Sequence, residues 1–486
     1  MATTDAAAAA APPSQLKLST ILAFACTSLP LSALTIAMSV YLPRHFASEI
    51  GISLLAVGTA FAFVRMIDIP LDPLLGLAMD RTRTRFGRYR LWTMIGAPVL
   101  MLAIFMLFIS PSGGVAGLIF WLLILYIGTS ILHLSHAAWA ATLAPRYNDR
   151  SRVFAIMTAV GVMGALLVLL MPFIVAALGR PESEGVPAMG WFVMILTPLA
   201  VWLVVALTPE KISPDVPGQQ KFQLKEYWRL IARPSMGRIV LADLCLSLGP
   251  GWMSALYLFF FTDSRGFTTS QASALLAVYI LAGFGGAPLL GRLAMRIGKH
   301  RAVMVATTGY ALALVALPFL PKGDMMIGAF QMFTAGFLAA GFQVLTRAMT
   351  ADVADEVRLE QGKERSGLLY AITTLTSKIS GAFAVFLTFT VLDRVGYIAT
   401  DGAVNTPEAV RGLEYAFLVG PIFFVALGGL CFVGYKLGEE RHSEIRQELD
   451  ERDALYDKAL YDNAPVIETL ASEPSIATPL VEPRKS

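Results

Sequence analysis

The sequence predicts an all-α membrane protein with twelve transmembrane helices in two six-helix bundles, and three observations lead to this prediction. The chain of 486 residues is 56% hydrophobic and 15% charged, whereas about a quarter of the residues in soluble domains are charged. Long apolar runs recur along its whole length, and about 20 apolar residues suffice to cross a bilayer core. Lysines and arginines gather in alternate loops between these runs, which is the pattern of a multi-pass protein.

The predicted spans are the apolar runs that lie between charged loops. The three cysteines, Cys26, Cys245 and Cys431, all fall inside such runs, so they are interpreted as small buried residues and not as a disulfide or metal site. The spans are expected at residues 17–43, 51–79, 91–111, 115–143, 151–178, 188–208, 238–262, 269–295, 301–320, 325–349, 366–392 and 413–436.

The basic loops predict the orientation of the chain. The loop after the second span, DRTRTRFGRYR at 80–90, holds five arginines, and the loops after spans four, six, eight and ten are also basic. Loops rich in lysine and arginine stay in the cytoplasm, so both termini are expected there. The N-terminal segment MATTDAAAAAAPPSQ lacks the basic region and cleavage site of a secretory signal. We therefore expect a multi-pass protein of the inner (plasma) membrane.

A weak internal repeat divides the chain into two halves. The tetrapeptide PLLG occurs at 73–76 and again at 288–291, each time near the cytoplasmic end of the second span of a half. Two six-span halves related in this way are typical of transporters. The expected organisation is a disordered tail (1–16), an N-terminal bundle (17–208), a cytoplasmic linker with a short amphipathic helix (209–237), a C-terminal bundle (238–436) and a polar cytoplasmic tail with an exposed charged helix (437–486).

The second span contains three charges in an otherwise apolar segment, RMIDIPLDPLLG at 65–76. Arg65, Asp68 and Asp72 have the spacing i, i+3, i+7, so they share one helix face. At 1.5 Å per residue, Asp68 lies about 22 Å along the helix, which is still within the hydrocarbon. Because a carboxylate there costs roughly 2.5–3.5 kcal/mol, this face is expected to point into the bundle or into a watery cavity.

Two interpretations of these charges are open. In the structural one, Arg65 and Asp68 form an ion pair and Asp72 caps a helix break before Pro73. In the functional one, which we favour, Asp68 and Asp72 bind a cation, because two carboxylates one turn apart can share a proton or ligate a bare ion.

Two further charges lie in apolar runs of the second half. Lys378 on span eleven is too far from either end of its span to reach the membrane surface. It is therefore predicted to pair with Asp68 or Asp72 across the two halves, and with Arg65 it forms the set of charge partners. Asp243, near the start of span seven, is interpreted as an interfacial or capping residue.

Polar and aromatic residues on several spans predict a pocket for a small molecule. The predicted substrate contacts are Ser32, Ser135, His136, Trp139, Trp252, Tyr257, Gln343, Tyr370 and Thr374. Charges in the cytoplasmic loops predict a gate of individually weak ion pairs. The predicted gate residues are Arg81, Arg88, Asp149, Arg292 and Asp352. No nucleophile–base constellation, metal cluster or phosphate-binding glycine loop is recognisable, so an enzyme is not expected.

The segment VRMIDIPLDPLLGLAMDRTRTRFGRYRLW, at 64–92, resembles the second-span signature of the glycoside–pentoside–hexuronide:cation symporters, the melibiose-carrier branch of the major facilitator superfamily. The shared pattern is R-x-x-D-x-x-x-D-P followed by a basic loop. The resemblance extends through the segment after span four and through span eleven, and covers roughly residues 17–436. It implies the major facilitator fold and the transport of a solute together with sodium, lithium or a proton, with no other cofactor.

The resemblance also implies roles for single residues. The cation-binding aspartates of the family fall on Asp68 and Asp72, its helix-face arginine on Arg65, its span-eleven lysine on Lys378 and its span-four tryptophan on Trp139.

This chain departs from the melibiose carriers at the substrate-binding positions. Their two galactoside-binding carboxylates fall on Ser32 and Ser135, their span-five arginine on Val160, and polar sodium ligands on Leu71 and Leu132. We therefore expect a less hydroxyl-rich or more amphipathic substrate than a galactoside, and we favour the proton over sodium.

The expected function is cation-coupled symport of a small solute, sugar- or glycoside-like, by alternating access. Transport of an amphipathic or lysolipid-like substrate, or proton-driven export, remains an alternative. The expected partners are the solute, the coupling cation and the lipid bilayer, with no nucleic acid and a monomeric state.

Overall fold

The protein is a bundle of long helices that cross from one face of the molecule to the other. The computed structural model describes residues 16–82, 84, 86–144, 147–210, 224–319, 321–362 and 366–461. Within these residues, 12 segments are long and apolar enough to span a membrane. The predicted disordered N-terminal tail and the end of the polar C-terminal tail lie outside the described residues.

The N-terminal half contains six spans, several of them built from more than one helical segment. Its helices are α1 (Leu18–Ala25), α2 (Ser28–Ile36), η1 (Ala37–Tyr41), α3 (Leu42–Ser48), α4 (Leu54–Arg81), α5 (Tyr89–Ile104), η2 (Phe105–Ile109), α6 (Gly114–Leu143), α7 (Tyr147–Val168), α8 (Met171–Ala177), η3 (Glu182–Glu184) and α9 (Gly185–Leu207).

The first span is longer than the sequence predicted and is interrupted. It runs from Leu18 to Ser48, with a break between α1 and α2 just before Pro30, which has no N–H to bond within a helix. The prediction ended the span at residue 43 because a charge, Arg44, follows. In the structure, Arg44 forms an ion pair with Asp263 of the other half at 3.6 Å, which allows the helix to continue.

The C-terminal half repeats the six-span arrangement after a short connecting helix, and a further helix follows it. Its helices are α10 (Leu224–Ile231), α11 (Pro234–Phe259), η4 (Phe260–Ser264), α12 (Thr269–Ile297), α13 (Lys299–Ala316), η5 (Leu317–Phe319), α14 (Met325–Gln361), α15 (Ser366–Arg394), α16 (Pro407–Leu430) and α17 (Glu439–Tyr461). The connecting helix α10 lies where a short amphipathic linker helix was predicted.

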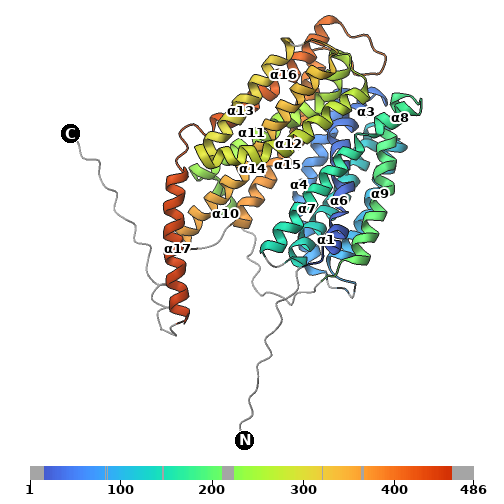
Figure 1. The fold of residues 1–486 in the computed structure, drawn as a ribbon. Helices are drawn as coiled ribbons and strands as arrows, with labels where there is room; N and C mark the ends of the chain where they lie inside the picture. Colours follow the sequence, from blue (N-terminus) through green and yellow to red (C-terminus); the bar gives the residue numbers. More distant parts are fainter. Residues whose placement is uncertain are drawn as a thin grey trace, which may run out of the picture.

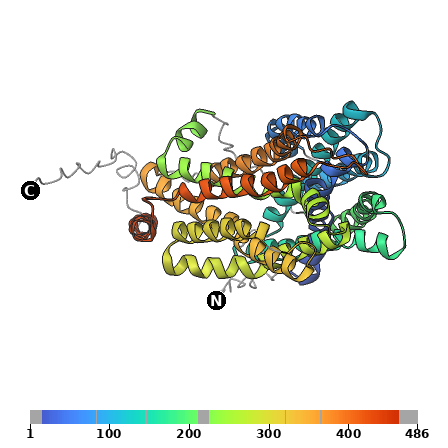
Figure 2. The same cartoon turned by 90° about the horizontal axis from the view of Figure 1, so that it is seen from above.

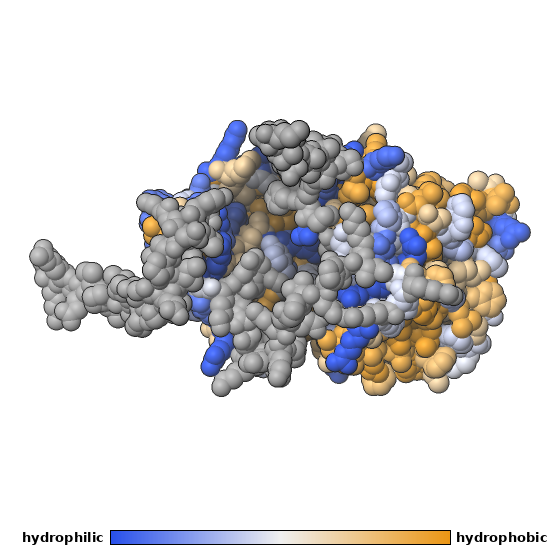
Figure 3. Space-filling model, turned by 90° about the horizontal axis from the view of Figure 1, so that it is seen from below, coloured by the Kyte–Doolittle hydropathy of each residue, from blue (hydrophilic) through white to orange (hydrophobic). Residues whose placement is uncertain are grey.

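The two halves lie side by side and contact each other mainly through α4 and α15 (Figures 1 and 2). A Cβ at Gly58 of α4 would lie 3.1 Å from the Cα of Phe386 on α15, so glycine is what permits this close approach. We call the end of the molecule where α1 begins and α17 lies the terminal face, and the other end the opposite face. In Figure 3, which looks onto the terminal face, hydrophilic side chains are spread over this face and hydrophobic ones predominate toward one edge.

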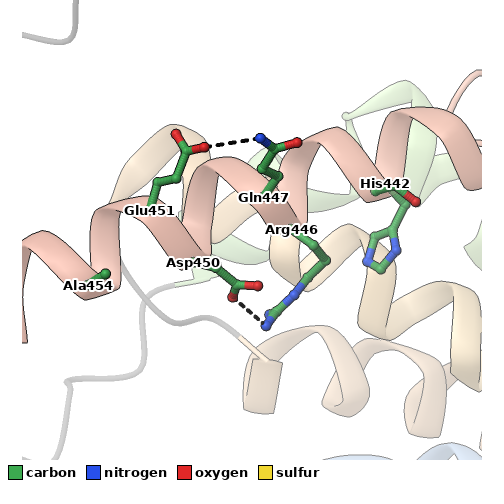
Figure 4. A pocket seen from close by; sticks show the side chains of 7 residues that line it. His442, Arg446, Gln447, Asp450, Glu451 and Ala454 are labelled. Carbon is green, nitrogen blue, oxygen red and sulfur yellow. Dashed lines mark hydrogen bonds and ion pairs between the residues drawn. The ribbon is translucent and has the colours of Figure 1, made fainter.

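Helix α14 continues well beyond the predicted end of its span, and α17 packs against this extension. Ile445 and Leu449 of α17 are buried in the contact, while His442 lies 3.1 Å from Asp355 and Arg358 lies 2.9 Å from Asp453. The predicted charged tail helix therefore exists, but one of its faces is not exposed as expected. Along its surface α17 has the i,i+4 pairs Arg446–Asp450 and Gln447–Glu451, which stabilise the helix itself (Figure 4).

Candidate cation and substrate site

A cluster of four charged side chains lies between the halves at mid-span. Asp68 of α4 accepts a hydrogen bond from Arg65 on the same helix at 3.1 Å, as the i, i+3 spacing predicts. The ammonium of Lys378, which comes from α15 in the other half, lies 2.9 Å from the same carboxylate oxygen. Lys378 also forms an ion pair with Asp72, one turn further along α4. The ammonium therefore bridges the two aspartates across the interface between the halves.

The four groups compensate one another, because two carboxylates face one guanidinium and one ammonium. The burial of the two acids differs: the Asp68 side chain is fully buried, whereas that of Asp72 is 22% exposed and that of Lys378 is 19% exposed. One oxygen of Asp72 is nevertheless buried without a hydrogen-bond partner. Asp72 is thus the acid of the cluster that an incoming cation can reach from outside.

The capping interpretation of Asp72 is wrong, because α4 continues from Leu54 to Arg81 with Pro70 and Pro73 inside it. A proline in a helix interior removes one backbone hydrogen bond, and here the surrounding helices hold the segment in place without a break. The Arg65–Asp68 pair of the structural interpretation does form. This pair coexists with the bridge from Lys378. Among the described residues, Lys378 is the ion-pair partner of Asp72.

Helix α6 contributes further residues to the cluster, of which Tyr126 and Ser130 were not selected from the sequence. Ser130 donates a hydrogen bond of 3.1 Å to the second oxygen of Asp68, and the Arg65 guanidinium lies 4.2 Å from the ring centre of Tyr126. His133 lies within electrostatic reach of Arg65, Asp72 and Lys378. The spacing i, i+4, i+7 of these α6 residues was the available signal, since it defines a single polar stripe.

A cavity of 380 Å³ lies beside this cluster in the C-terminal half, where α11, α12, α14 and α15 meet. Gly381 and Ser377, which line it, flank Lys378 in the sequence, and a Cβ at Gly381 would lie 3.8 Å from the Arg65 guanidinium. The lining is uncharged and mostly apolar. It includes Leu246, Ser247, Pro250, Tyr279, Ile280, Phe342, Gln343 and Ser377 together with small residues.

The predicted substrate contacts divide into two groups in the structure. Gln343 lines the cavity, Tyr370 and Thr374 are exposed on the neighbouring α15, and Ser32 is half-buried on α2. The other predicted contacts are buried in helix packing and do not face the cavity; these are Ser135, His136, Trp139, Trp252 and Tyr257.

Each of these buried residues makes its polar contacts within its own half of the protein. His136 stacks on Phe24 and its ring nitrogen lies 2.9 Å from the Phe24 carbonyl. Trp252 donates to the carbonyl of Ala416 at 2.8 Å, and Tyr257 donates to that of Ala272 at 2.9 Å. Their polar atoms are thus satisfied by the backbone, as expected for polar groups that position helices.

The opposite face has a set of contacts between the halves that the sequence analysis missed. The hydroxyls of Tyr41 and Ser273 are 2.7 Å apart, and Thr269 donates to Glu182 at 2.6 Å. Tyr397 donates to Asp263, the partner of Arg44. Burial and the adjacent Asp263 carboxylate raise the pKa of Tyr397, so its phenol keeps the proton that it donates. These contacts close the opposite face.

The terminal face lacks such contacts among the described residues. Asp352 pairs with Lys299 at 2.6 Å and approaches His442 at 3.4 Å, both in its own half. Among the described residues, Arg81, Asp149 and Arg292 form no ion pair with the other half. The backbone N–H of Arg88 donates to Glu210 of its own half at 2.8 Å. The halves diverge toward this face in Figure 1. The formation of the predicted gate pairs stays a prediction.

We expect a covalent link at the opposite face to block transport reversibly. In a variant in which Cys26, Cys245 and Cys431 are replaced by alanine, Tyr41→Cys together with Ser273→Cys places one thiol on each half, separated by about the length of the tyrosine ring that now joins them. A short bifunctional thiol reagent with a reducible spacer should link them and stop uptake into cells, and a reductant should restore it. A matched pair on one half, Thr93→Cys with Ser135→Cys, replaces another hydroxyl contact and should not block uptake when treated in the same way. Unimpaired uptake in the fully cross-linked Tyr41–Ser273 pair would contradict this role.

Comparison with known proteins identifies the family. A family model described as MFS/sugar transport protein matches residues 23–439. The chain belongs to this family. It is 26% identical over 438 residues to the uncharacterised symporter YnaJ of Bacillus subtilis, with 86% of this chain and 92% of that protein covered. The resemblance to glycoside–pentoside–hexuronide:cation symporters is thereby confirmed, and the protein is a multi-pass protein of the inner membrane.

Other relatives of this MFS transporter differ in what their names say they carry. The isoprimeverose transporter of Lactiplantibacillus pentosus is 23% identical, covering 86% of this chain and 89% of that protein. The sodium-dependent lysophosphatidylcholine symporter 1-B of Danio rerio is 22% identical, covering 80% and 81%. The crystal structure of the nucleoside transporter NupG superposes with a TM-score of 0.63 at 13% identity, covering 86% of this chain and 100% of that one. This structural likeness supports the major facilitator fold.

Proposed function

We propose that the protein is a secondary active transporter that carries a neutral sugar- or glycoside-like solute together with a cation. The observation that supports this most strongly is the bridge from Lys378 to Asp68 and Asp72. The family and the relatives are transporters and not enzymes. The Lys378 ammonium lies at the interface between the two halves, and a free cation would contact the same two carboxylates at this position.

The coupling follows from charge balance. Without an ion, the cluster of Arg65, Asp68, Asp72 and Lys378 has no net charge. A cation that neutralises one aspartate leaves one positive charge in excess, so the Lys378 ammonium is free to leave the carboxylates. Its neighbours Ser377 and Gly381 line the cavity, and the ammonium can then donate hydrogen bonds to oxygen atoms of a solute there. Ion binding thus prepares the solute site.

The ligands favour a proton as the coupling ion. The side-chain oxygens at the cluster are those of the two carboxylates and of Ser130, while Leu71 and Leu132 supply none. Sodium needs several oxygen ligands to replace its water, whereas a proton needs one carboxylate oxygen.

The alternating-access cycle assigns roles to both faces. We assign the terminal face to the cytoplasm, because the basic loops lie there. In this conformation the contacts at Tyr41, Arg44 and Glu182 close the outer face, while the cytoplasmic ends of the halves are apart. Movement of one half against the other would break these contacts and bring the charged cytoplasmic loops together.

A second candidate substrate is an amphipathic molecule. The cavity has no ionised lining residue, and Leu246, Pro250, Ile280 and Phe342 give it an apolar wall. A solute with one apolar side, such as a glycoside with a hydrophobic aglycone or a lysolipid, buries apolar area there at about 25 cal/mol per Å². The relative from Danio rerio is named for such a substrate.

A ligand screen on the purified full-length protein tests the proposal. Sugars, alkyl and aryl glycosides, organic acids and lysophospholipids are added with and without sodium at two pH values, and the thermal unfolding midpoint is measured. A ligand at about 100 times its Kd stabilises the native state by about 2.7 kcal/mol. We expect a neutral glycoside or an amphipathic ligand to raise the midpoint, and more so at the lower pH. Stabilisation by organic acids alone would contradict the proposed substrate class.

A further inference from the structure

Asp243 of α11 is a buried carboxylate that the transport cycle described above does not use. The sequence placed it at the membrane interface or at a helix cap. The capping role is wrong, because α11 begins at Pro234, and Asp243 is 4% exposed and packed within the C-terminal half. Its contacts are hydroxyl groups on two other helices. Thr346 of α14 lies 3.4 Å from one carboxylate oxygen, and Thr376 of α15 contacts the other.

No positively charged side chain of the described residues forms an ion pair with Asp243. Arg347 of α14 is the charged group within electrostatic reach, but its side chain is exposed and makes no such pair. The nearby Lys378 of α15 is directed to Asp68 and Asp72 in the other half. The remaining groups that face Asp243 are the neutral hydroxyls of Thr346, Thr376 and Ser377. Burying an ionised carboxylate without a cation costs roughly several kcal/mol of free energy, and this cost is avoided when the group takes up a proton.

The hydrogen bonds around Asp243 also favour a protonated carboxyl group. A threonine hydroxyl has one hydrogen to donate. The hydroxyl of Thr346 is 2.8 Å from the carbonyl of Phe342, and that of Thr376 is 2.7 Å from the carbonyl of Thr373, so each already has an acceptor in its own helix. Two hydroxyl hydrogens therefore face two backbone carbonyls and both oxygens of Asp243. A proton on the carboxyl group supplies a third hydrogen, which it can donate to one of the two threonine hydroxyls, so that this threonine donates to its own carbonyl.

Asp243 also lies next to the solute cavity. Ser377, whose hydroxyl faces Asp243, is one of the residues that line the cavity. Ser247, one turn along α11 from Asp243, lines it too, and its hydroxyl oxygen is buried without a hydrogen-bond partner. A proton can thus pass between water in the cavity and the carboxyl group past the Ser377 hydroxyl, without crossing apolar packing.

We propose that Asp243 is a second proton-binding site, which lies in the C-terminal half and exchanges its proton with the solute cavity. The proton comes from hydronium in the cavity, which leaves as water, and binds to a carboxylate oxygen; it returns to water by the reverse step. The role of this site rests on the proposed transport function. With one proton-binding site in each half, the charge on both walls of the solute site would depend on pH. The occupancy of Asp243 can be measured without transport.

Infrared difference spectroscopy of the purified full-length protein tests this proposal. Samples labelled with ¹³C-aspartate are titrated between neutral and alkaline pH, and the carbonyl stretch of protonated aspartic acid is followed. We expect a band at neutral pH that disappears reversibly at alkaline pH, is lost in Asp243→Asn and is retained in Asp68→Asn. Asparagine donates hydrogen bonds as the protonated acid does, so the Asp243→Asn variant should fold.

A second variant gives an independent measurement. Thr376→Val removes one hydroxyl and keeps Asp243, so the band should remain but shift in frequency; Thr388→Val, a threonine on α15 bonded only to carbonyls of its own helix among the described contacts, should leave the band unchanged. The proposal is overturned if the wild type has no band, if Asp243→Asn keeps the full band, or if the band persists at every pH at which the protein is folded. Loss of the band only in Asp68→Asn would instead assign the proton to the cation site and overturn the second site alone.

Discussion

Replacing Asp68 by asparagine is expected to abolish cation-driven accumulation of the solute. Asp68 is fully buried and accepts hydrogen bonds from Arg65, Lys378 and Ser130. The amide has nearly the same shape but no negative charge, so it can neither take up a proton in this pH range nor hold the Lys378 ammonium. Uptake into cells or vesicles should then reach no more than the external concentration, whereas the wild type concentrates the solute several-fold or more, to roughly the limit that the ion gradient sets.

The control for this variant separates coupling from folding. Exchange of solute across the membrane without an ion gradient should persist in Asp68→Asn, and membrane fractions should contain the protein at a level comparable with the wild type. Ser130→Ala removes one hydrogen bond to the same carboxylate but keeps its charge, so it should weaken accumulation without abolishing it. Full accumulation by Asp68→Asn would show that the coupling ion binds elsewhere.

Replacing Lys378 by alanine is expected to destabilise the protein strongly. The substitution leaves Asp68 and Asp72 one turn apart with the Arg65 guanidinium as their remaining cation. Removing one member of a buried ion pair costs about 3–5 kcal/mol, because a charge is left uncompensated. The thermal unfolding midpoint should therefore fall well below that of the wild type, and added sodium or a lower pH should restore part of it by supplying the missing positive charge.

A double substitution tests whether charge is the cause. Lys378→Ala with Asp72→Asn removes one positive and one negative group, so the cluster is again balanced by Arg65 and Asp68. The double variant should regain most of the lost stability, and the difference between the single and double variants measures the coupling. If the double variant is less stable than Lys378→Ala alone, the lysine acts through packing and not through the bridge.

The fold could be predicted from the sequence because the bilayer restricts the choice. A chain with apolar runs of this length must satisfy its backbone hydrogen bonds internally, which makes each run a helix. The part of the chain that the structure describes has 12 such segments. The ends were predicted less well. Span one continues past Arg44 because a partner in the other half pairs with that charge, and α14 continues past residue 349 because α17 covers its charged extension.

The candidate site could be predicted in part, for a similar reason. Arg65, Asp68 and Asp72 stood out because charges are rare within a span and their spacing places them on one face. The choice of substrate residues on α6 was less successful. Ser135, His136 and Trp139, which the sequence predicted as substrate contacts, are buried, whereas Tyr126 and Ser130, which were not selected, contact the cluster. Their spacing was visible in the sequence, but in a helix that is apolar on all sides the hydrophobic pattern does not show which polar stripe faces the cluster.

The sequence by itself determined which residues must be membrane-buried, how many times the chain crosses, and which charges need a partner, because transfer of a group into hydrocarbon depends on that group and on its near neighbours in the chain. Only the tertiary structure decided that one ammonium serves both Asp68 and Asp72. It also decided that Asp243 contacts hydroxyls and forms no ion pair with a described residue, and that the halves meet at Tyr41 and Ser273. These contacts join residues far apart in the chain, and they depend on how helices rotate and pack against one another, which the pattern along a single helix does not specify.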